Sequence, residues 1–349
     1  MNSRRRTLAF ALVLGSLGAL CPTSAIIAQN NIIPDDTLGA ESSQVNGLDA
    51  TTDLIEGGAL RDTTLFHSFQ ELNVAEGLAV YFNNPTNVDN IFSRVTGVNS
   101  SNILGTLGVR GAANLFLINP NGILFGPEAD LDIQGSFLAT TASTINRNGN
   151  NIFPPSSQDD SPLLVSVPMG LQYGPSSSTA TIDNSGLLSA GQDLTFIAGQ
   201  INSSGLLLAN NNIRLSANNI DLSNSIDSSA PSDEGTAFDL LESGVASGRA
   251  GNDGTIEISA TNLSVKDGAQ LLTQSGGGDI VLDIVETARF DGVGRSSDIL
   301  SGAFSELPSG ETGTAGNISV NAATVEVLNG AQLASISAGT GDSGNVLIN

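Results

Sequence analysis

The chain has 349 residues, of which 40% are hydrophobic, 13% charged and 4% aromatic, and its formal net charge is −23. A chain of this length and hydrophobic content can bury a large, mainly aliphatic core, which excludes wholesale disorder. The strongly acidic balance disfavours binding to nucleic acid and to anionic membrane surfaces.

Residues 1–28 have the order of segments that is typical of a secretory signal peptide. Three arginines at 4–6 precede an apolar run at 8–20, and small residues follow. The run is too short to span a membrane. We expect cleavage after Ala28, with the site after Ala25 as the second choice.

Cys21 is the only cysteine of the chain. It lies within the predicted signal peptide, so the processed chain would have no disulfide scaffold, thiol nucleophile or cysteine-rich zinc site. Leu20 is bulky where lipidation of Cys21 would need a small residue. We therefore expect no stable membrane anchor.

Residues 29–150 contain apolar runs that do not repeat, and the segment NLFLINPNGILFG at 114–126 is the most informative of them. Two apolar runs flank a polar centre that consists of Asn119, Pro120, Asn121 and Gly122. Proline fixes φ, the first asparagine can bond to backbone two residues on, and glycine permits the exit. The pattern predicts a turn between two buried strands.

His67 is the only histidine and lies between Phe66 and Ser68. A packed or partly exposed imidazole is the expected role, because no second histidine exists to share a metal. A serine hydrolase triad is disfavoured, because the sequence has no Gly-x-Ser-x-Gly elbow.

Residues 151–349 have the pattern of an all-β structure. Short apolar runs at 256–258, 263–265, 280–282 and 318–320 alternate with Gly, Asn, Asp and Ser. No segment keeps a convincing helical period, and the nearest candidate is the short stretch 237–245.

An internal repeat gives this region its shape. Residues 254–275 align without a gap on 316–337, with 9 identities in 22 positions. The offset between the copies suggests about three coils of roughly 20 residues each, as in solenoids. A third copy begins at 344–349 and stops after one strand, so we expect the sequence to end inside a repeat and to be the front of a longer protein.

Turns and loops can be placed within this solenoid. Asp267-Gly268 and Asn329-Gly330 occupy equivalent positions of the two copies and predict tight corners. Segments rich in Ser, Pro, Gly and acidic residues predict loops that project from the wall, at 151–162, 223–235 and 310–316. The predicted fold class is all-β: a right-handed parallel β-helix (solenoid) with an N-terminal β cap and extruding loops.

Acidic residues are the remaining candidates for chemistry. Asp130 and Asp132 lie two apart on one strand face, but a calcium site needs several more oxygen ligands. The pairs 159–160 and 233–234 fall in loop-like stretches, where solvation is expected. Lys266 is the only lysine, which makes a lyase site hard to assemble. We expect no metal, no cofactor and no catalysis; the alternative is a secreted β-helical carbohydrate-active enzyme.

Four segments carry a resemblance to a known family: DTLGAESSQV at 36–45, LIEGGALRDTTLFHSFQELNV at 54–74, NVDNIFSRVTG at 87–97 and NLFLINPNGILFGPEADLDIQGSFLATTAS at 114–143. In these segments the chain resembles the secretion-domain region of filamentous haemagglutinin-like exoproteins of two-partner secretion systems. The resemblance covers residues 29–200 well, and the repeats that follow are similar to the family's β-helical shaft.

The resemblance implies a route and a division of the chain. Residues 1–28 are the signal peptide, 29–150 the cap with the two-partner secretion (haemagglutination-activity) domain, and 151–349 its β-helical continuation. An outer-membrane β-barrel transporter of the Omp85 type would recognise the domain in the periplasm and thread the chain outward. The product would be a secreted or cell-surface adhesin, with host-cell or surface receptors or glycans as further partners.

The resemblance also assigns residues. The family's Asn-Pro-Asn-Gly secretion motif falls on Asn119, Pro120, Asn121 and Gly122. Its second motif, Asn-Pro-Asn-Leu, is matched only at Asn84 and Pro85, because Thr86 and Asn87 follow. From the turn chemistry, a structural corner is favoured over direct partner contact at 119–122. Both can hold if the turn fixes a strand that joins the transporter by edge pairing.

Overall fold

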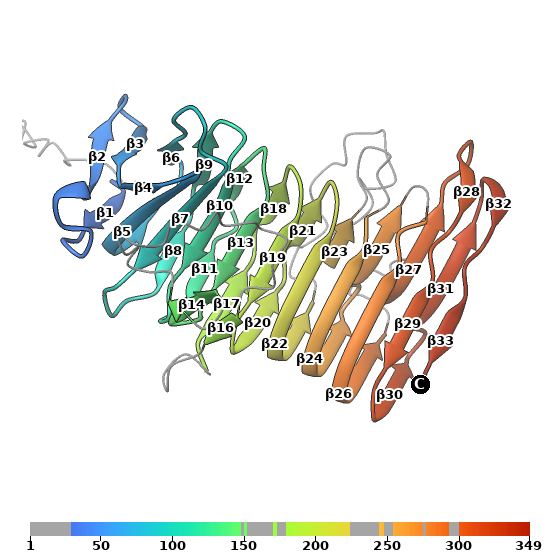
Figure 1. The fold of residues 1–349 in the computed structure, drawn as a ribbon. Helices are drawn as coiled ribbons and strands as arrows, with labels where there is room; N and C mark the ends of the chain where they lie inside the picture. Colours follow the sequence, from blue (N-terminus) through green and yellow to red (C-terminus); the bar gives the residue numbers. More distant parts are fainter. Residues whose placement is uncertain are drawn as a thin grey trace, which may run out of the picture.

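The computed structural model describes residues 29–147, 150–151, 170–172, 179–223, 244–247, 254–274, 277–292 and 300–349. These residues form an elongated stack of coils, in which strands far apart in sequence lie side by side along one axis (Figure 1). The predicted signal peptide, residues 1–28, lies outside the described residues. Within the described ranges no helix is long and apolar enough to cross a membrane.

Three strands in each complete coil give the β-helix three faces. The first face begins at the N-terminal end and runs through the whole stack by parallel pairing. Its strands are β5 (Thr64–Asn73), β7 (Asn90–Val95), β10 (Asn114–Ile118), β13 (Phe137–Thr140), β19 (Leu194–Ile197), β22 (Ile213–Leu222), β24 (Ile256–Lys266), β26 (Ile280–Asp291), β29 (Ile318–Asn321) and β33 (Val346–Ile348).

Within each coil, the strand of the first face is followed by a corner and then by a strand of the second face. Its strands are β8 (Ser101–Ile103), β11 (Ile123–Phe125), β17 (Thr181–Asn184), β20 (Gln200–Ser203), the second halves of β22, β24 and β26, and β30 (Thr324–Leu328). Because β22, β24 and β26 continue around that corner, one long strand contributes to two faces.

The third face closes each coil. Its N-terminal part comprises β3 (Thr52–Gly57), β6 (Ala79–Asn83), β9 (Thr106–Arg110) and β12 (Asp130–Asp132). Its later part comprises β18 (Leu187–Ala190), β21 (Leu206–Ala209), β23 (Gly244–Ser247), β25 (Gln270–Gln274), β27 (Gly302–Leu307) and β31 (Gln332–Ser337).

Antiparallel strands cap the N-terminal end. They are β1 (Asn31–Pro34) and β4 (Ala59–Arg61), which pair with β5, and β2 (Ser43–Gly47), which pairs with β3. A single 3-10 turn, η1 (Gly39–Glu41), lies between β1 and β2. Short strands outside the coils are β14 (Thr144–Arg147), β15 (Asn150–Asn151), β16 (Gly170–Gln172), β28 (Thr312–Thr314) and β32 (Thr340–Asp342).

Alternation along each strand fills the interior. In β24, Ile256, Ile258, Leu263 and Val265 are buried, whereas most of the residues between them are partly or fully exposed. One continuous apolar cluster runs from Ile55 to Ala331. The predicted all-β, right-handed parallel β-helix with an N-terminal cap is therefore confirmed.

The two repeat copies occupy equivalent positions, but the predicted number of coils between them is wrong. Ile256 pairs with Ile280, and Ile280 pairs in turn with Ile318. The offset between the copies is therefore two coils, and the second of them is the longer. This longer coil contains residues 293–299, which lie outside the described residues.

The other local predictions have mixed outcomes. Asp267 and Asn329 have φ of 57° and 52°, and each is followed by a glycine near 90°, so both predicted corners are confirmed. Segment 310–316, predicted as a loop, contains the short strand β28, which pairs with β32. Most of the predicted loop 151–162, all of 223–235 beyond Ser223, and most of the helical candidate 237–245 lie outside the described residues.

The sheets continue past the predicted domain boundary at residue 150. Strand β13 pairs with β19, and β11 pairs with β17, so the coils on either side of the boundary are in direct contact. The division into 29–150 and 151–349 stays a prediction.

Candidate recognition site at the N-terminal coils

The Asn119–Gly122 segment forms the corner between β10 and β11, in the stack of N-terminal coils. Asn119 is fully buried. Its side-chain amide donates to the carbonyl of Asn99 at 3.1 Å and to the hydroxyl of Ser101 at 3.0 Å. Its side-chain oxygen accepts the backbone N–H of Asn121 at 3.0 Å. One buried side chain thus closes its own turn and joins it to the preceding coil.

The rest of the motif completes the corner in the way the sequence predicts. The N–H of Gly122 donates to the carbonyl of Asn119 at 3.2 Å. Gly122 has a φ of 119°, a conformation that side chains disfavour. Asn121 is exposed, and its amide donates to the carbonyl of Gly97 at 2.8 Å. Asn121 is therefore the exposed residue of the motif, and Pro120 is partly exposed.

The strands beside the corner already have neighbours on both edges. β10 pairs with β7 and β13, and β11 pairs with β8 and β17. The hypothesis that one of these strands joins the transporter by edge pairing is therefore wrong for the folded domain. A strand can add a partner only where its N–H and C=O groups are unpaired.

The partial second motif, Asn84 and Pro85, lies at the corner between β6 and β7. With the side-chain amide in the orientation that gives both its N and its O a partner, Asn84 donates to the carbonyls of Val88 and Pro85 at 3.1 and 3.2 Å. In that orientation its oxygen accepts the N–H of Ala113 at 3.2 Å. Asn87 has a φ of 69°. Asn84 thus repeats the arrangement of Asn119: an asparagine closes a turn and links it to a neighbouring coil.

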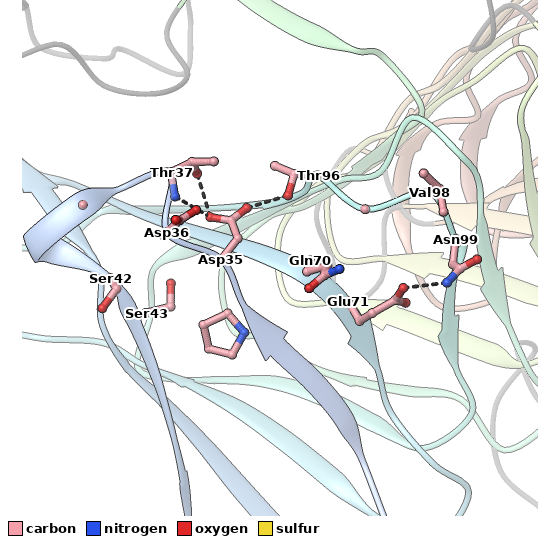
Figure 2. Close-up of a pocket in the computed structure, with 13 residues that line it drawn as sticks. Asp35, Asp36, Thr37, Ser42, Ser43, Gln70, Glu71, Thr96, Val98 and Asn99 are labelled. Atoms are coloured by element: carbon pink, nitrogen blue, oxygen red, sulfur yellow. Dashed lines mark hydrogen bonds between the residues drawn. The ribbon is translucent and has the colours of Figure 1, made fainter.

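A cleft of about 910 Å³ lies beside the motif, between the segment that follows β1 and the loop that follows β7 (Figure 2). Asp35, Asp36 and Glu71 are the charged side chains among the described residues that line it. Val98 is 84% exposed at its rim. The lining would attract a cation or a basic segment more readily than an anion.

Asp35 is the most strongly organised group of the cleft. Its carboxylate accepts from the hydroxyls of Thr96 at 2.5 Å, Thr37 at 2.7 Å and Ser68 at 2.8 Å. Burial alone would raise the pKa of Asp35, but the hydrogen bonds from these hydroxyls and from the Thr37 N–H outweigh it and lower the pKa. The carboxylate therefore stays charged and ties the N-terminal segment to the loop after β7.

The predicted motif and the cleft are connected through that loop. The side-chain amides of Asn119 and Asn121 donate to the backbone carbonyls of Asn99 and Gly97, respectively. The Asn99 side chain in turn donates to Glu71 at 2.6 Å. The sequence did not predict the cleft, because its walls come from segments that are far apart in the chain. The only local signal was that segments 36–45, 54–74, 87–97 and 114–143 carry the family resemblance together.

His67 is packed, as the sequence predicts. It is fully buried on β5, and its Nδ1 lies 3.1 Å from the hydroxyl of Ser43. Its ring lies 5.3 Å from that of Phe82 and 6.2 Å from that of Phe69. Burial lowers the pKa of His67 to about 3, so the imidazole is neutral at ordinary pH.

The acidic pair Asp130 and Asp132 lies on the exposed face of β12. Asp132 accepts a hydrogen bond from the Tyr81 hydroxyl at 2.9 Å. Within the part of the chain that the structure describes, no group of three or more His, Cys, Asp or Glu residues could hold a metal ion. Asp159, Asp160, Asp233 and Glu234 lie outside that part.

Known proteins with similar sequences include a secretion-domain family and one curated relative. A family model described as the TPS secretion domain matches residues 30–299. The heme/hemopexin-binding protein of Haemophilus influenzae is 34% identical over 86 residues. That match covers 24% of this chain and 9% of the relative, so the chain spans a small part of the relative's length.

Two solved structures are similar. The HMW1 secretion domain from Haemophilus influenzae is 15% identical, with a TM-score of 0.40, over 92% of this chain and 99% of that one. A filamentous hemagglutinin secretion domain is 17% identical, with a TM-score of 0.45, over 90% of this chain and 99% of that one.

The family model therefore covers the cap, the motif corner, the cleft and most of the later coils. Members of this family are secretion domains of exoproteins, which leave the cell with the help of a partner transporter. This chain belongs to the family of TPS (two-partner secretion) secretion domains.

Proposed function

We propose that the N-terminal part of this chain directs its export through an outer-membrane β-barrel transporter of the Omp85 type. The observation that carries this proposal is the secretion-domain match over residues 30–299. The corner at Asn119–Gly122 supports it, because the family's motif falls on a turn that orders the acidic cleft beside it. The mature product would then be secreted or held at the cell surface.

We further propose that the N-terminal coils nucleate the folding of the β-helix. Their interior holds large aromatic side chains, such as Phe69, Phe82 and Phe125, all fully buried. A second aromatic cluster lies apart from the main core, on strands of the first face. In it, Phe92 stacks on Phe66 and on Phe116, with ring centroids 5.5 and 4.2 Å apart. Buried aromatic area on both sides of one sheet stabilises these coils more than the aliphatic coils that follow.

The exported chain would act as an adhesin, binding a receptor or glycan on another surface. Two features support a binding role over catalysis: the family consists of exoproteins, and the curated relative is named for what it binds. The competing function is a carbohydrate-active enzyme. Binding of the purified chain to cells or glycans without cleavage would support the first, whereas saturable polysaccharide hydrolysis or elimination would support the second.

The export proposal is tested by expressing the full chain with and without its partner barrel, followed by fractionation. With the barrel, we expect the processed chain outside the cell or at its surface. Without it, we expect the same processed chain in the periplasm. Equal amounts outside the cell under both conditions would overturn the proposal.

A further inference from the structure

Each coil of the β-helix begins with a short polar residue that bonds to the coil before it. These residues immediately precede the strands of the first face or, at Asn114, open one. They are Asn114, Ser136, Asp193, Asn212, Thr255, Asp279, Asn317 and Asn345. We call this set the start ladder.

Six steps of the start ladder have the same pair of hydrogen bonds. In each step, the backbone N–H of the later residue donates to the side-chain oxygen of the earlier one. The distances are 2.8 Å for Ser136 to Asn114, 3.3 Å for Asp193 to Ser136, 3.1 Å for Asn212 to Asp193, 3.1 Å for Thr255 to Asn212, 2.7 Å for Asn317 to Asp279 and 3.0 Å for Asn345 to Asn317.

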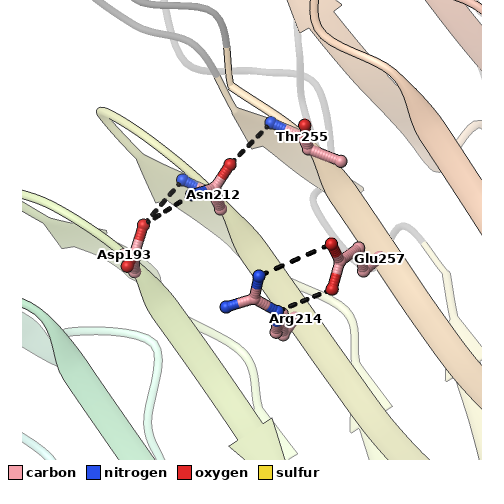
Figure 3. A network of polar contacts seen from close by, with 5 residues as sticks. All are labelled: Asp193, Asn212, Arg214, Thr255 and Glu257. Carbon is pink, nitrogen blue, oxygen red and sulfur yellow. Dashed lines mark hydrogen bonds and ion pairs between the residues drawn. The ribbon is translucent and has the colours of Figure 1, made fainter. Parts of the chain in front are cut away.

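In the second bond of each pair, the earlier coil is the donor. The residue directly after the earlier ladder residue donates its backbone N–H to the backbone carbonyl of the later ladder residue. For example, Leu194 donates to Asn212 and Ile213 to Thr255, both at 2.9 Å. Figure 3 shows the side-chain bonds at two of these steps, from Asp193 through Asn212 to Thr255. At these six steps the new coil is therefore held at its first residue by two bonds, one of which needs a side-chain acceptor.

The ladder is directional and independent of coil length. In all six side-chain steps, the earlier coil supplies the acceptor and the later coil the donor. Asn212, Asn317 and Asn345 add amide bonds of 3.0, 3.1 and 3.4 Å in the same sense. The steps span from 19 residues, Asp193 to Asn212, to 57 residues, Ser136 to Asp193. The same bond therefore forms at the coil start whatever the number of residues between two ladder residues.

Glycines before the ladder residues let the coils approach. Gly278, Gly316 and Gly344 precede Asp279, Asn317 and Asn345, and a Cβ on Gly316 or Gly344 would overlap the carbonyl oxygen of the glycine one coil earlier. At these three coil starts the sequence has one pattern: glycine, then Asp or Asn, then an aliphatic residue.

We propose that the start ladder sets the register of each coil on the preceding one, in the N-to-C order. A coil that begins one or two residues out of place leaves this N–H unpaired and loses its bond to the finished coil. This inference rests on the proposed function and deepens it, because it names the contacts by which later coils would stack on the N-terminal coils. The ladder residues are positioning residues for coil stacking.

The test uses the full chain with Cys21→Ser, refolded in oxidised and reduced glutathione, with two alternative cysteine pairs. Thr195→Cys with Arg214→Cys reports correct register, because these residues are partners. Thr195→Cys with Ser216→Cys reports a slip of two residues. Partner Cα atoms lie about 4.8 Å apart and slipped ones about 8 Å, so only the correct pair can form a disulfide without slippage.

Asp193→Ala removes the ladder acceptor, and Asp193→Asn keeps an oxygen there. The matched control is Asp183→Ala, because Asp183 bonds the Asn202 side chain at 2.7 Å and is not a member of the ladder. We expect about tenfold more slipped disulfide in Asp193→Ala than in Asp183→Ala, the factor that corresponds to about 1.4 kcal/mol, and rescue by Asp193→Asn. Equal slipped product in Asp193→Ala and Asp183→Ala would overturn the proposal.

If Asp193→Ala fails to refold, hydrogen exchange during refolding decides the question. If the backbone amides of residues 64–140 are protected and those after residue 193 are not, the result supports the ladder. Equal loss of amide protection before and after residue 193 overturns it. Because no transporter takes part in refolding, the result is independent of the export proposal.

Discussion

The N-terminal coils and the later coils share one backbone path but are stabilised differently. Between residues 64 and 140 the interior and one outer face carry phenylalanines, and buried asparagines such as Asn119 hold the corners. After residue 194 the interior is mainly aliphatic, and the start ladder, which begins at Asn114, continues through these coils. This difference agrees with the proposal that the first region folds without a preceding coil, whereas each later coil stacks on its neighbour.

The largest expected effect is the loss of stability when a buried side chain is truncated in one region or in the other. Phe125→Ala removes a buried ring that stacks on Phe196 at 5.6 Å, and we expect a loss of about 3–5 kcal/mol. Because later coils stack on this one, hydrogen exchange should increase throughout residues 179–349. Leu282→Ala, also in a fully buried position, should increase exchange mainly in its own coil and the next. Equally local effects of both variants would contradict the comparison.

A smaller effect concerns pH and is confined to the N-terminal region, because His67 is the only histidine. Its folded-state pKa is about 3, below the unfolded value near 6.5, so the unfolded state binds a proton that the folded state does not. The free energy of unfolding therefore decreases as pH falls from 6.5 toward 3, by about 2 kcal/mol at pH 5. Urea unfolding at pH 7 and pH 5 measures this difference.

The control for the pH effect is His67→Gln, which cannot titrate. Its stability should change less between pH 7 and pH 5 than that of the wild type, by about 2 kcal/mol. The same pH dependence in both chains would show that carboxylates, and not His67, cause the acid sensitivity.

The smallest expected effect lies on the later coils. The Arg214–Glu257 pair, 2.6 Å apart, is about half exposed at both side chains (Figure 3). Surface ion pairs contribute about 0–1 kcal/mol, so Arg214→Ala should change stability by less than about 1 kcal/mol. A larger loss in urea unfolding would mean that surface charges, and not the core and the coil starts, hold the later coils together.

The accuracy of sequence-based prediction follows the same division between local and distant interactions. Turns such as Asp267-Gly268 and the Asn119 corner were predicted correctly, because the chemistry of a turn resides in adjacent residues. The predicted number of coils between the two repeat copies was wrong, since coils differ in length without a regular sequence pattern. The edge-pairing hypothesis does not hold for the folded domain, because strands of other coils already pair with both edges of β10 and β11.

The same limit explains what was missed at the candidate site. The cleft unites Asp35, Glu71 and Val98 from three separate segments, and the start ladder joins residues as distant in the chain as Ser136 and Asp193. The local pattern of one sequence does not show which residues far apart in the chain come into contact. The family resemblance supplied the motif residues, and the structure showed that the first of them, Asn119, is fully buried.

The role of the N-terminal coils in secretion is tested most directly by export of Asn119→Ala beside Asn329→Ala, each in the full chain co-expressed with the partner barrel. Both positions are asparagines at β corners, but Asn119 is buried in the N-terminal coils and Asn329 is exposed in the last ones. We expect Asn119→Ala to accumulate as processed protein in the periplasm while Asn329→Ala reaches the surface at the wild-type level. Wild-type surface yield for Asn119→Ala would contradict a secretion role for this corner.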